Sequence, residues 1–223
     1  MERTSIRWMK TWCSESLQMR ARASLCTVVV AALCACSFLP RIAAATDGPR
    51  AVVEKTTTSV LAVLGDKTLS SDAKRHRIED IAYAEVDFET LSRLVLAKNW
   101  GRLSPEQQRE FIQEFKQHLS ITYGHNVDNY KNEKVTIVGD REEARGDWTV
   151  QTKILRGGPD DIAIDYRLRQ KDGEWRIIDI IIEGVSLLSN FRSQFQEIIA
   201  NDGADKLLRL LREKNAKGEP LKS

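Results

Sequence analysis

Residues 133–182 read EKVTIVGDREEARGDWTVQTKILRGGPDDIAIDYRLRQKDGEWRIIDIII, and this stretch decides the fold. Its apolar residues alternate with polar ones in three runs: Val135 and Ile137; Trp148, Val150, Thr152 and Ile154; Ile162, Ile164, Tyr166 and Leu168. Turn signals separate the runs at Gly139-Asp140, Gly157-Gly158-Pro159 and Lys171-Asp172-Gly173. With the run from Trp175 to Ile182, the pattern predicts four antiparallel strands joined by short connections, with one face towards solvent.

The fourth run differs from the other three because it does not alternate. It holds five isoleucines, at positions 177, 178, 180, 181 and 182, so both of its faces are apolar. Such a strand is either the most deeply covered one in the sheet, or one of its faces lines a space that is not filled by protein.

Helical patterns flank the predicted sheet on both sides. The clearest start is at Ser104, because Pro105 occupies the first helical position and Gln107 completes a capping box. Helical spacing also predicts helices over residues 53–64, 70–86, 88–100, 187–199 and 207–211. The predicted class is α+β: a twisted four-stranded antiparallel sheet, with helices from both chain ends packed over it, enclosing an apolar cavity in the case that the fourth strand lines a space not filled by protein.

The first 45 residues have the three-part layout of a secretory signal peptide. A basic segment precedes the apolar run from Ser24 to Leu39, and Ala43-Ala44-Ala45 provides a cleavage pattern before Thr46. The apolar run is short for a membrane span, which needs about 20 residues. A retained anchor helix and a lipoprotein modified at Cys36 are the alternatives. We therefore predict a signal peptide over residues 1–45 and a single domain over 46–223, long enough to form one core.

Composition excludes several classes of protein. The leader carries six of the 34 Lys and Arg residues and two of the 32 Asp and Glu residues, which leaves 28 against 30 and a net charge of −2. That balance does not favour a nucleic-acid partner. All four cysteines lie within the first 36 residues, and the three histidines are scattered, so we expect no disulfide, no metal site and no cofactor in the domain.

Two enzyme interpretations arise from the fourth strand and the segment after it. The run Gly184-Val185-Ser186-Leu187-Leu188 is similar to a nucleophile elbow, but Leu188 stands where close packing needs glycine, so Ser186 is interpreted as a helix cap. Asp179 and Tyr166 could perform acid–base chemistry in an apolar cavity, as in a small-molecule isomerase or hydratase. A third hypothesis is an interaction module with a solid core.

The order of several residues along the chain resembles the MlaC family. The first set is Asp87-Phe88, Leu96-Ala97, Trp100, Phe111, Phe115, Leu119 and Tyr123. The second set is Trp175, Asp179, Glu183-Gly184-Val185-Ser186-Leu187 and Asn190-Phe191-Arg192-Ser193-Gln194-Phe195. MlaC proteins are the periplasmic phospholipid-binding components of the toluene-tolerance (Mla) lipid transport system, and the hopanoid-associated toluene-tolerance protein is a near relative.

This resemblance implies a soluble, monomeric, periplasmic carrier that moves phospholipid, or a hopanoid, between the inner and outer membranes. Its implied partners are an inner-membrane ABC transporter complex and an outer-membrane lipoprotein complex, and no catalytic residue is implied. The predicted lipid-binding side chains are Val150, Ile154, Ile164, Tyr166, Ile177, Ile181, Leu188, Phe191 and Phe195. The lipid headgroup is expected at the mouth of the cavity, near Arg141, Arg145 or Arg192.

Overall fold

The computed structural model describes residues 47–124, 127, 130–156 and 161–221. The predicted signal peptide lies outside the described residues. Within those ranges, no helix combines the length and the apolar character needed to cross a membrane. The elements run in the order α2 (Pro49–Gly65), α3 (Ser71–Glu85), α4 (Phe88–Leu96), η2 (Ala97–Arg102), α5 (Pro105–Gly124), β1 (Lys134–Glu142), η4 (Ala144–Gly146), β2 (Trp148–Leu155), β3 (Ile162–Lys171), β4 (Glu174–Ile182), β5 (Val185–Ser186), α6 (Leu187–Asp202) and α7 (Ala204–Lys217).

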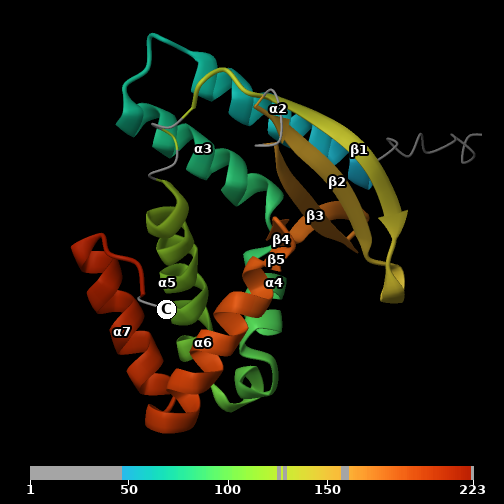
Figure 1. The fold of residues 1–223 in the computed structure, drawn as a ribbon. Coiled ribbons are helices and arrows are strands. Elements are labelled where there is room, and N and C mark those ends of the chain that lie inside the picture. The colour runs from blue at the N-terminus through green and yellow to red at the C-terminus, as the bar shows by residue number, and fades with distance from the viewer. Residues whose placement is uncertain (1–46, 125–126, 128–129, 157–160, 222–223) are drawn as a thin grey trace, which may run out of the picture. The chain divides into compact units, whose positions relative to one another are not determined.

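The sheet is antiparallel and its strands are paired in chain order, from β1 to β5 (Figure 1). The predicted α+β class is therefore confirmed, but the predicted number of four strands is wrong. A two-residue strand, β5, pairs with the end of β4 through Ile181–Ser186 and Ile182–Val185. It forms because Gly184, with φ +78°, lets the chain turn back directly after β4.

Side-chain caps fix the starts of α5 and α6, as predicted at Ser104 and Ser186. The Ser104 amide donates to Oε1 of Gln107 at 2.9 Å, and the Gln107 amide donates to Oγ of Ser104 at 3.2 Å, which completes the predicted capping box of α5. Ser186 Oγ accepts from the Ser189 amide at 3.0 Å at the start of α6. These local bonds satisfy amides that have no partner inside the helix.

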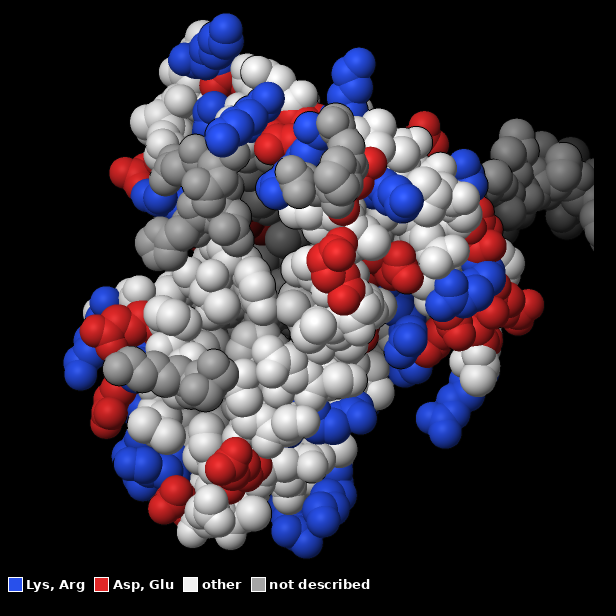
Figure 2. Space-filling model, in the orientation of Figure 1, with Lys and Arg blue, Asp and Glu red and all other residues white. Residues whose placement is uncertain are grey.

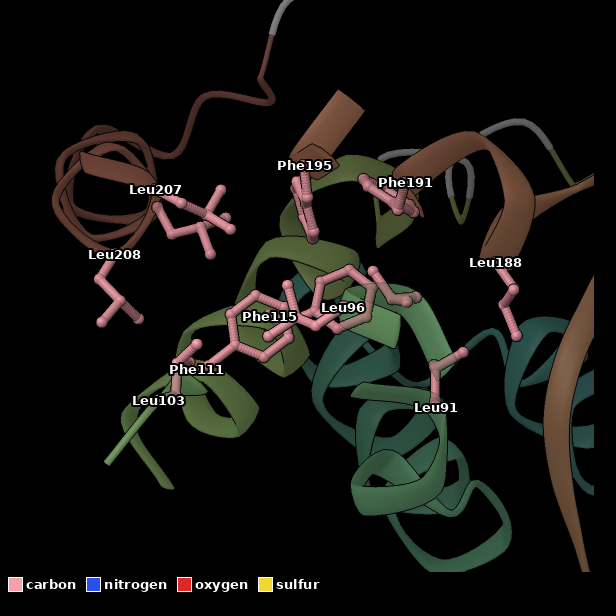
Figure 3. Packing of buried hydrophobic residues seen from close by; sticks show 12 residues of the cluster. Leu91, Leu96, Leu103, Phe111, Phe115, Leu188, Phe191, Phe195, Leu207 and Leu208 are labelled. Carbon is pink, nitrogen blue, oxygen red and sulfur yellow. The ribbon is translucent and has the colours of Figure 1, made fainter. Parts of the chain in front are cut away.

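The apolar interior consists of two clusters rather than the single core that the chain length allows. The helical cluster joins α4, η2, α5, α6 and α7, and Figure 3 shows how its side chains converge: Leu91, Val95, Leu96, Leu103, Phe111, Phe115, Leu188, Phe191, Phe195, Leu207, Leu208 and Leu211. The sheet cluster joins α2 to the sheet through Val52, Val53, Val150, Leu168 and Ile177. Val86 packs against both clusters and forms a bridge to Ile177, so it marks their junction.

One buried polar group, His118, holds the C-terminal segment against α5. Its Nε2 atom accepts a hydrogen bond from the Leu221 amide at 3.2 Å, and its Nδ1 atom lies 3.1 Å from Oδ1 of Asn215 on α7. Nε2 must be unprotonated to accept from an amide, so Nδ1 carries the proton and donates to Asn215. The side-chain amide of Asn215 donates in turn to Oε2 of Glu114 at 2.7 Å. The network therefore requires a neutral imidazole.

This geometry predicts a loss of stability in mild acid. Burial lowers the pKa of His118 below its ordinary value, and the hydrogen bond to Asn215 opposes this only in part. Because the pKa is lower in the folded than in the unfolded chain, the stabilisation is complete above the unfolded pKa of about 6.5 and is lost as the pH falls through the folded value. Melting temperatures measured from pH 7 to pH 5 should fall more for the unchanged chain than for His118→Gln. Parallel curves would contradict this.

Candidate functional site

A cavity of about 380 Å³ lies where the two apolar clusters meet, and its walls are almost wholly apolar. Figure 2 shows a hollow in the middle of the visible face, with uncharged side chains along its lower border. Elements α3, α4, α5, β3, β4 and α6 all contribute to the wall. The side chains come from the helical cluster (Leu91, Phe115, Leu188, Phe191), from the sheet cluster (Ile177) and from residues that are only partly buried.

Helix α3 forms one side of the cavity without having any buried residue of its own. Ile78, Ala82 and Val86 recur at every fourth position, so they share one face, and all three line the cavity. An amphipathic helix normally buries such a stripe against other side chains. Here Ile78 and Ala82 face the cavity, whereas Val86, directly after α3, also packs against both clusters. The surface formed by Ile78 and Ala82 is therefore available to a ligand.

The sheet side of the wall is set by an irregularity in β4. Ile164 pairs with Ile182 and Tyr166 pairs with Ile180, and all four line the cavity. Between Ile177 and Asp179, strand β4 contains one extra residue, Ile178, opposite the step from Arg167 to Leu168. A bulge of this kind shifts the alternation of side chains by one position.

The expected alternation from Ile177 through Asp179 to Ile181 is therefore broken. Ile181 pairs with Asp165 and Ser186, and the structure does not place it in the cavity wall. Ile180 and Ile182 occupy the wall instead. Without the bulge, Ile181 would share the cavity face with Ile177, and Ile180 and Ile182 would lie on the opposite face, because the side-chain period of a strand is two.

The structure brings five of the nine predicted side chains to the cavity: Ile164, Tyr166, Ile177, Leu188 and Phe191. The other four lie elsewhere. Val150 is fully buried under α2 in the sheet cluster, and Phe195 is fully buried among the rings of the helical cluster. Ile154 is half-buried on β2, between Val135 and Ile162, and Ile181 has been shifted by the bulge. These positions differ from the prediction because an apolar residue type does not reveal whether its neighbour is protein or empty space.

Sequence reasoning missed the half of the wall that α3, α4 and α5 provide. The additional aromatic and aliphatic members include Tyr83, Phe88, Phe115, Leu119 and Tyr123. Their signal was present, since Phe115, Leu119 and Tyr123 recur at every fourth position along α5. That pattern predicts an apolar face but does not say what the face covers.

Three tyrosines in the wall keep their protons at physiological pH. Burial raises the pKa of Tyr166 to about 12, and burial also raises the pKa values of Tyr83 and Tyr123. The phenols therefore add no charge to the cavity, and desolvation of a phenolate is the physical cause in each case.

Asp179, the candidate acid–base residue, is 3% exposed and both of its carboxylate oxygens are engaged. Oδ2 accepts from Oγ of Ser186 at 2.6 Å, and Oδ1 accepts from the Leu188 amide at 3.0 Å. The carboxylate therefore ties β4 to the first turn of α6. In the register of the sheet, Tyr166 lies opposite Ile180 rather than opposite Asp179.

We expect Asp179 to contribute to stability. Asp179→Ala should lower the free energy of unfolding by about 2 kcal/mol, because it leaves the buried Leu188 amide without an acceptor. Asp179→Asn keeps one acceptor and should cost about 1 kcal/mol. Urea denaturation measures both, with Glu197→Gln, at an exposed position of α6, as the control. Equal stability of Asp179→Ala and the unchanged chain would contradict the structural role.

The three arginines expected at the mouth of the cavity do not line it. Arg192 donates from Nε and Nη2 to the Leu94 carbonyl at 3.0 and 2.6 Å, which joins α6 to α4. Arg141 pairs with Glu143 at 2.9 Å near the end of β1, and Arg145 lies in η4 between β1 and β2. The cations that do line the cavity are Arg75 of α3 and Lys116 of α5.

Comparison with known proteins identifies several relatives of this chain. The toluene tolerance protein ttg2D of Pseudomonas putida is 25% identical over 176 residues, which cover 74% of this chain and 80% of that protein. The intermembrane phospholipid transport system binding protein MlaC of Haemophilus influenzae is 25% identical over 127 residues, which cover 55% of this chain and 59% of that protein.

A solved structure shares the fold. The phospholipid-binding protein from Ralstonia solanacearum, determined in complex with a phospholipid, superimposes with a TM-score of 0.69 and is 27% identical. The match covers 77% of this chain and 99% of that protein. The model of the MlaC protein family matches residues 54–213, well over half of the chain, and confirms the resemblance seen in the sequence. The chain belongs to the MlaC family.

Proposed function

We propose that this protein is a periplasmic carrier that holds phospholipid by its acyl chains and moves it between the inner and outer membranes. The observation that carries the proposal is the apolar cavity of about 380 Å³ between the helical and sheet clusters. The relatives support the ligand class, because their names describe phospholipid transport in one case and a bound phospholipid in another. The signal-peptide pattern of residues 1–45 supports export from the cytoplasm.

The size of the cavity fits hydrocarbon. A cavity of about 150 Å³ in another protein binds benzene, so about 380 Å³ corresponds to roughly 15 carbon atoms, the length of one common acyl tail. A second tail needs additional room. Helix α3, with no buried residue, is the wall that can move outwards at the least cost in lost packing.

Transfer to and from a membrane requires no chemistry. Each buried CH₂ group is worth about 0.8 kcal/mol against water, so a tail of 16 carbons is held by on the order of 12 kcal/mol. A bilayer offers nearly the same stabilisation as an apolar cavity, so exchange between the two is close to neutral, whereas passage through water alone is prohibitive. Partners would supply energy and passage through the membranes. We assign these roles to an inner-membrane ABC transporter complex and an outer-membrane lipoprotein complex, met by a monomeric carrier.

Native mass spectrometry of the protein exported from a Gram-negative host tests the carrier function. We expect an adduct of phospholipid mass on a chain that starts at Thr46. After removal of the lipid, the protein should take up phospholipid again from vesicles. Protein that carries no lipid and takes none from vesicles would refute the carrier function, and an intact leader would refute the cleavage.

A further inference from the structure

Most of the polar side chains of the cavity wall lie on α3 and α5. The polar residues are Arg75, Glu79, Lys116, Ser120 and Asp179, and the first four lie on these two helices. Asp179, on β4, has both oxygens engaged by the start of α6. The remainder of the wall is aliphatic or aromatic, apart from the phenol groups of the tyrosines. The α3–α5 side is therefore the polar end of an otherwise apolar cavity.

Lys116, at this end of the cavity, has an ammonium group that contacts aromatic rings. Its Nζ atom lies 3.4 Å from the centroid of the Tyr83 ring and 5.6 Å from that of Phe88. The side chain is half-buried, and within the described part of the chain no carboxylate forms an ion pair with it. Lys171, by contrast, pairs with both Asp87 and Glu89. The ammonium of Lys116 is thus positioned by two rings and left without an anion.

The acidic group on the same side does not neutralise Lys116. Glu79 accepts a hydrogen bond from Oγ of Ser120, and its Oε2 atom lies 3.3 Å from Nδ1 of the His76 imidazole. The adjoining part of α3 has balanced charges: Lys74, Arg75 and Arg77 are offset by Asp72, Glu79 and Asp80, and Arg75 contacts Asp72. The position for an anion at this end is therefore set by Lys116, whose charge no carboxylate neutralises within the described residues.

We propose that Lys116, assisted by Arg75, binds the phosphate group of the phospholipid whose tails occupy the cavity. This inference rests on the carrier function proposed above and adds the position and chemistry of the headgroup. The tails then extend from the α3–α5 side towards Ile164, Tyr166 and Phe191. A charge-assisted hydrogen bond to phosphate favours a phospholipid over a diacylglycerol with the same tails.

A competition experiment tests the proposal on the full-length, exported protein. Delipidated protein is mixed with vesicles that contain dipalmitoyl phosphatidylglycerol and dipalmitoylglycerol in equal amounts, and the bound lipids are quantified by mass spectrometry. Lys116→Gln should lower the ratio of bound phosphatidylglycerol to bound dipalmitoylglycerol by about tenfold. Lys116→Arg, which keeps the charge, should retain most of the preference.

The matched control is Lys206→Gln, which changes another half-buried helical lysine with no ion pair among the described residues, on α7 and away from the cavity. It should leave the ratio unchanged. The ratio is informative even if loss of the contact with Tyr83 loosens the fold, because loosening reduces the uptake of both lipids.

In the unchanged chain, the preference itself should decline at high ionic strength. An unchanged ratio in Lys116→Gln would overturn the phosphate site while the carrier function stands. Failure of the unchanged chain to take up either lipid would overturn both.

Discussion

Replacing Ile180 with glutamate is expected to reduce retention of phospholipid by about a hundredfold, whereas the same change at Ile181 should leave retention within about threefold of the unchanged chain. The two residues are adjacent and chemically identical. They differ in position, because Ile180 lies in the cavity wall opposite Tyr166 and Ile181 pairs with Asp165 outside that wall.

The size of the effect follows from the desolvation of the introduced charge. In the empty cavity a carboxylate at position 180 can remain hydrated, so the fold itself should tolerate it. When an acyl tail enters, that water is displaced and the charge has no partner in an apolar wall, which costs several kcal/mol or forces protonation. At position 181 the carboxylate does not meet the tail.

Delipidated variants are mixed with phospholipid vesicles, and the bound lipid is measured after the protein is separated from them. Circular dichroism and melting temperatures confirm that both variants fold. Equal loss in the two variants would show that the cavity wall does not bind the lipid. Loss only in Ile181→Glu would show that the strand presents its other face to the ligand.

This comparison also marks how far the sequence could predict the fold. The capping box at Ser104 and Gln107 is local, so it predicts the start of α5 without any knowledge of the tertiary structure. The pairing register of β2 with β3 likewise agrees with the alternation of apolar and polar residues in both strands. In β4 isoleucines lie on both sides of Asp179 without alternating with polar residues, so nothing in the sequence reveals the extra residue at Ile178.

The sequence allows an apolar cavity to be expected but does not identify all of the residues that line it. The two apolar faces of β4 are consistent either with a deeply covered strand or with a space beside the sheet, and the structure has a cavity there, with Ile164 and Tyr166 in its wall. Val150 and Phe195 have the same chemical character as those liners, yet other side chains cover them. Which apolar surface stays uncovered depends on how α2 and α3 pack against the rest of the domain, and these contacts are distant in sequence.

Phe195→Ala is expected to cause the largest loss of stability among the changes considered, about 4 kcal/mol in the free energy of unfolding. Phe195 is fully buried. Its ring centroid lies 5.7 Å from that of Phe111, 5.3 Å from that of Phe115 and 5.6 Å from that of Phe191. Truncation leaves a void among these rings that the surrounding helices cannot readily fill, and it removes the edge-to-face contacts with Phe111 and Phe115.

Phe191→Ala is the matched comparison, because Phe191 lies one helical turn away on α6 and its ring faces the cavity. Its truncation enlarges an existing space rather than opening a new one, so we expect a loss of about 2 kcal/mol. Lipid retention, unlike stability, should be reduced more by Phe191→Ala than by Phe195→Ala. Phe191→Ala should weaken it about tenfold through lost contact area, and Phe195→Ala should leave it nearly unchanged well below the melting temperature.

Urea denaturation of delipidated protein measures the stabilities, since bound lipid would stabilise the folded state and mask the difference. Vesicle uptake at low temperature measures retention. If both substitutions lowered stability and retention to the same degree, packing and ligand binding would share one set of side chains. The distinction between Phe195, which protein encloses, and Phe191, which borders the cavity, would then be wrong. Opposite orders in the two measurements are expected because Phe195 contacts protein on all sides, whereas Phe191 contacts protein on one side and the cavity on the other.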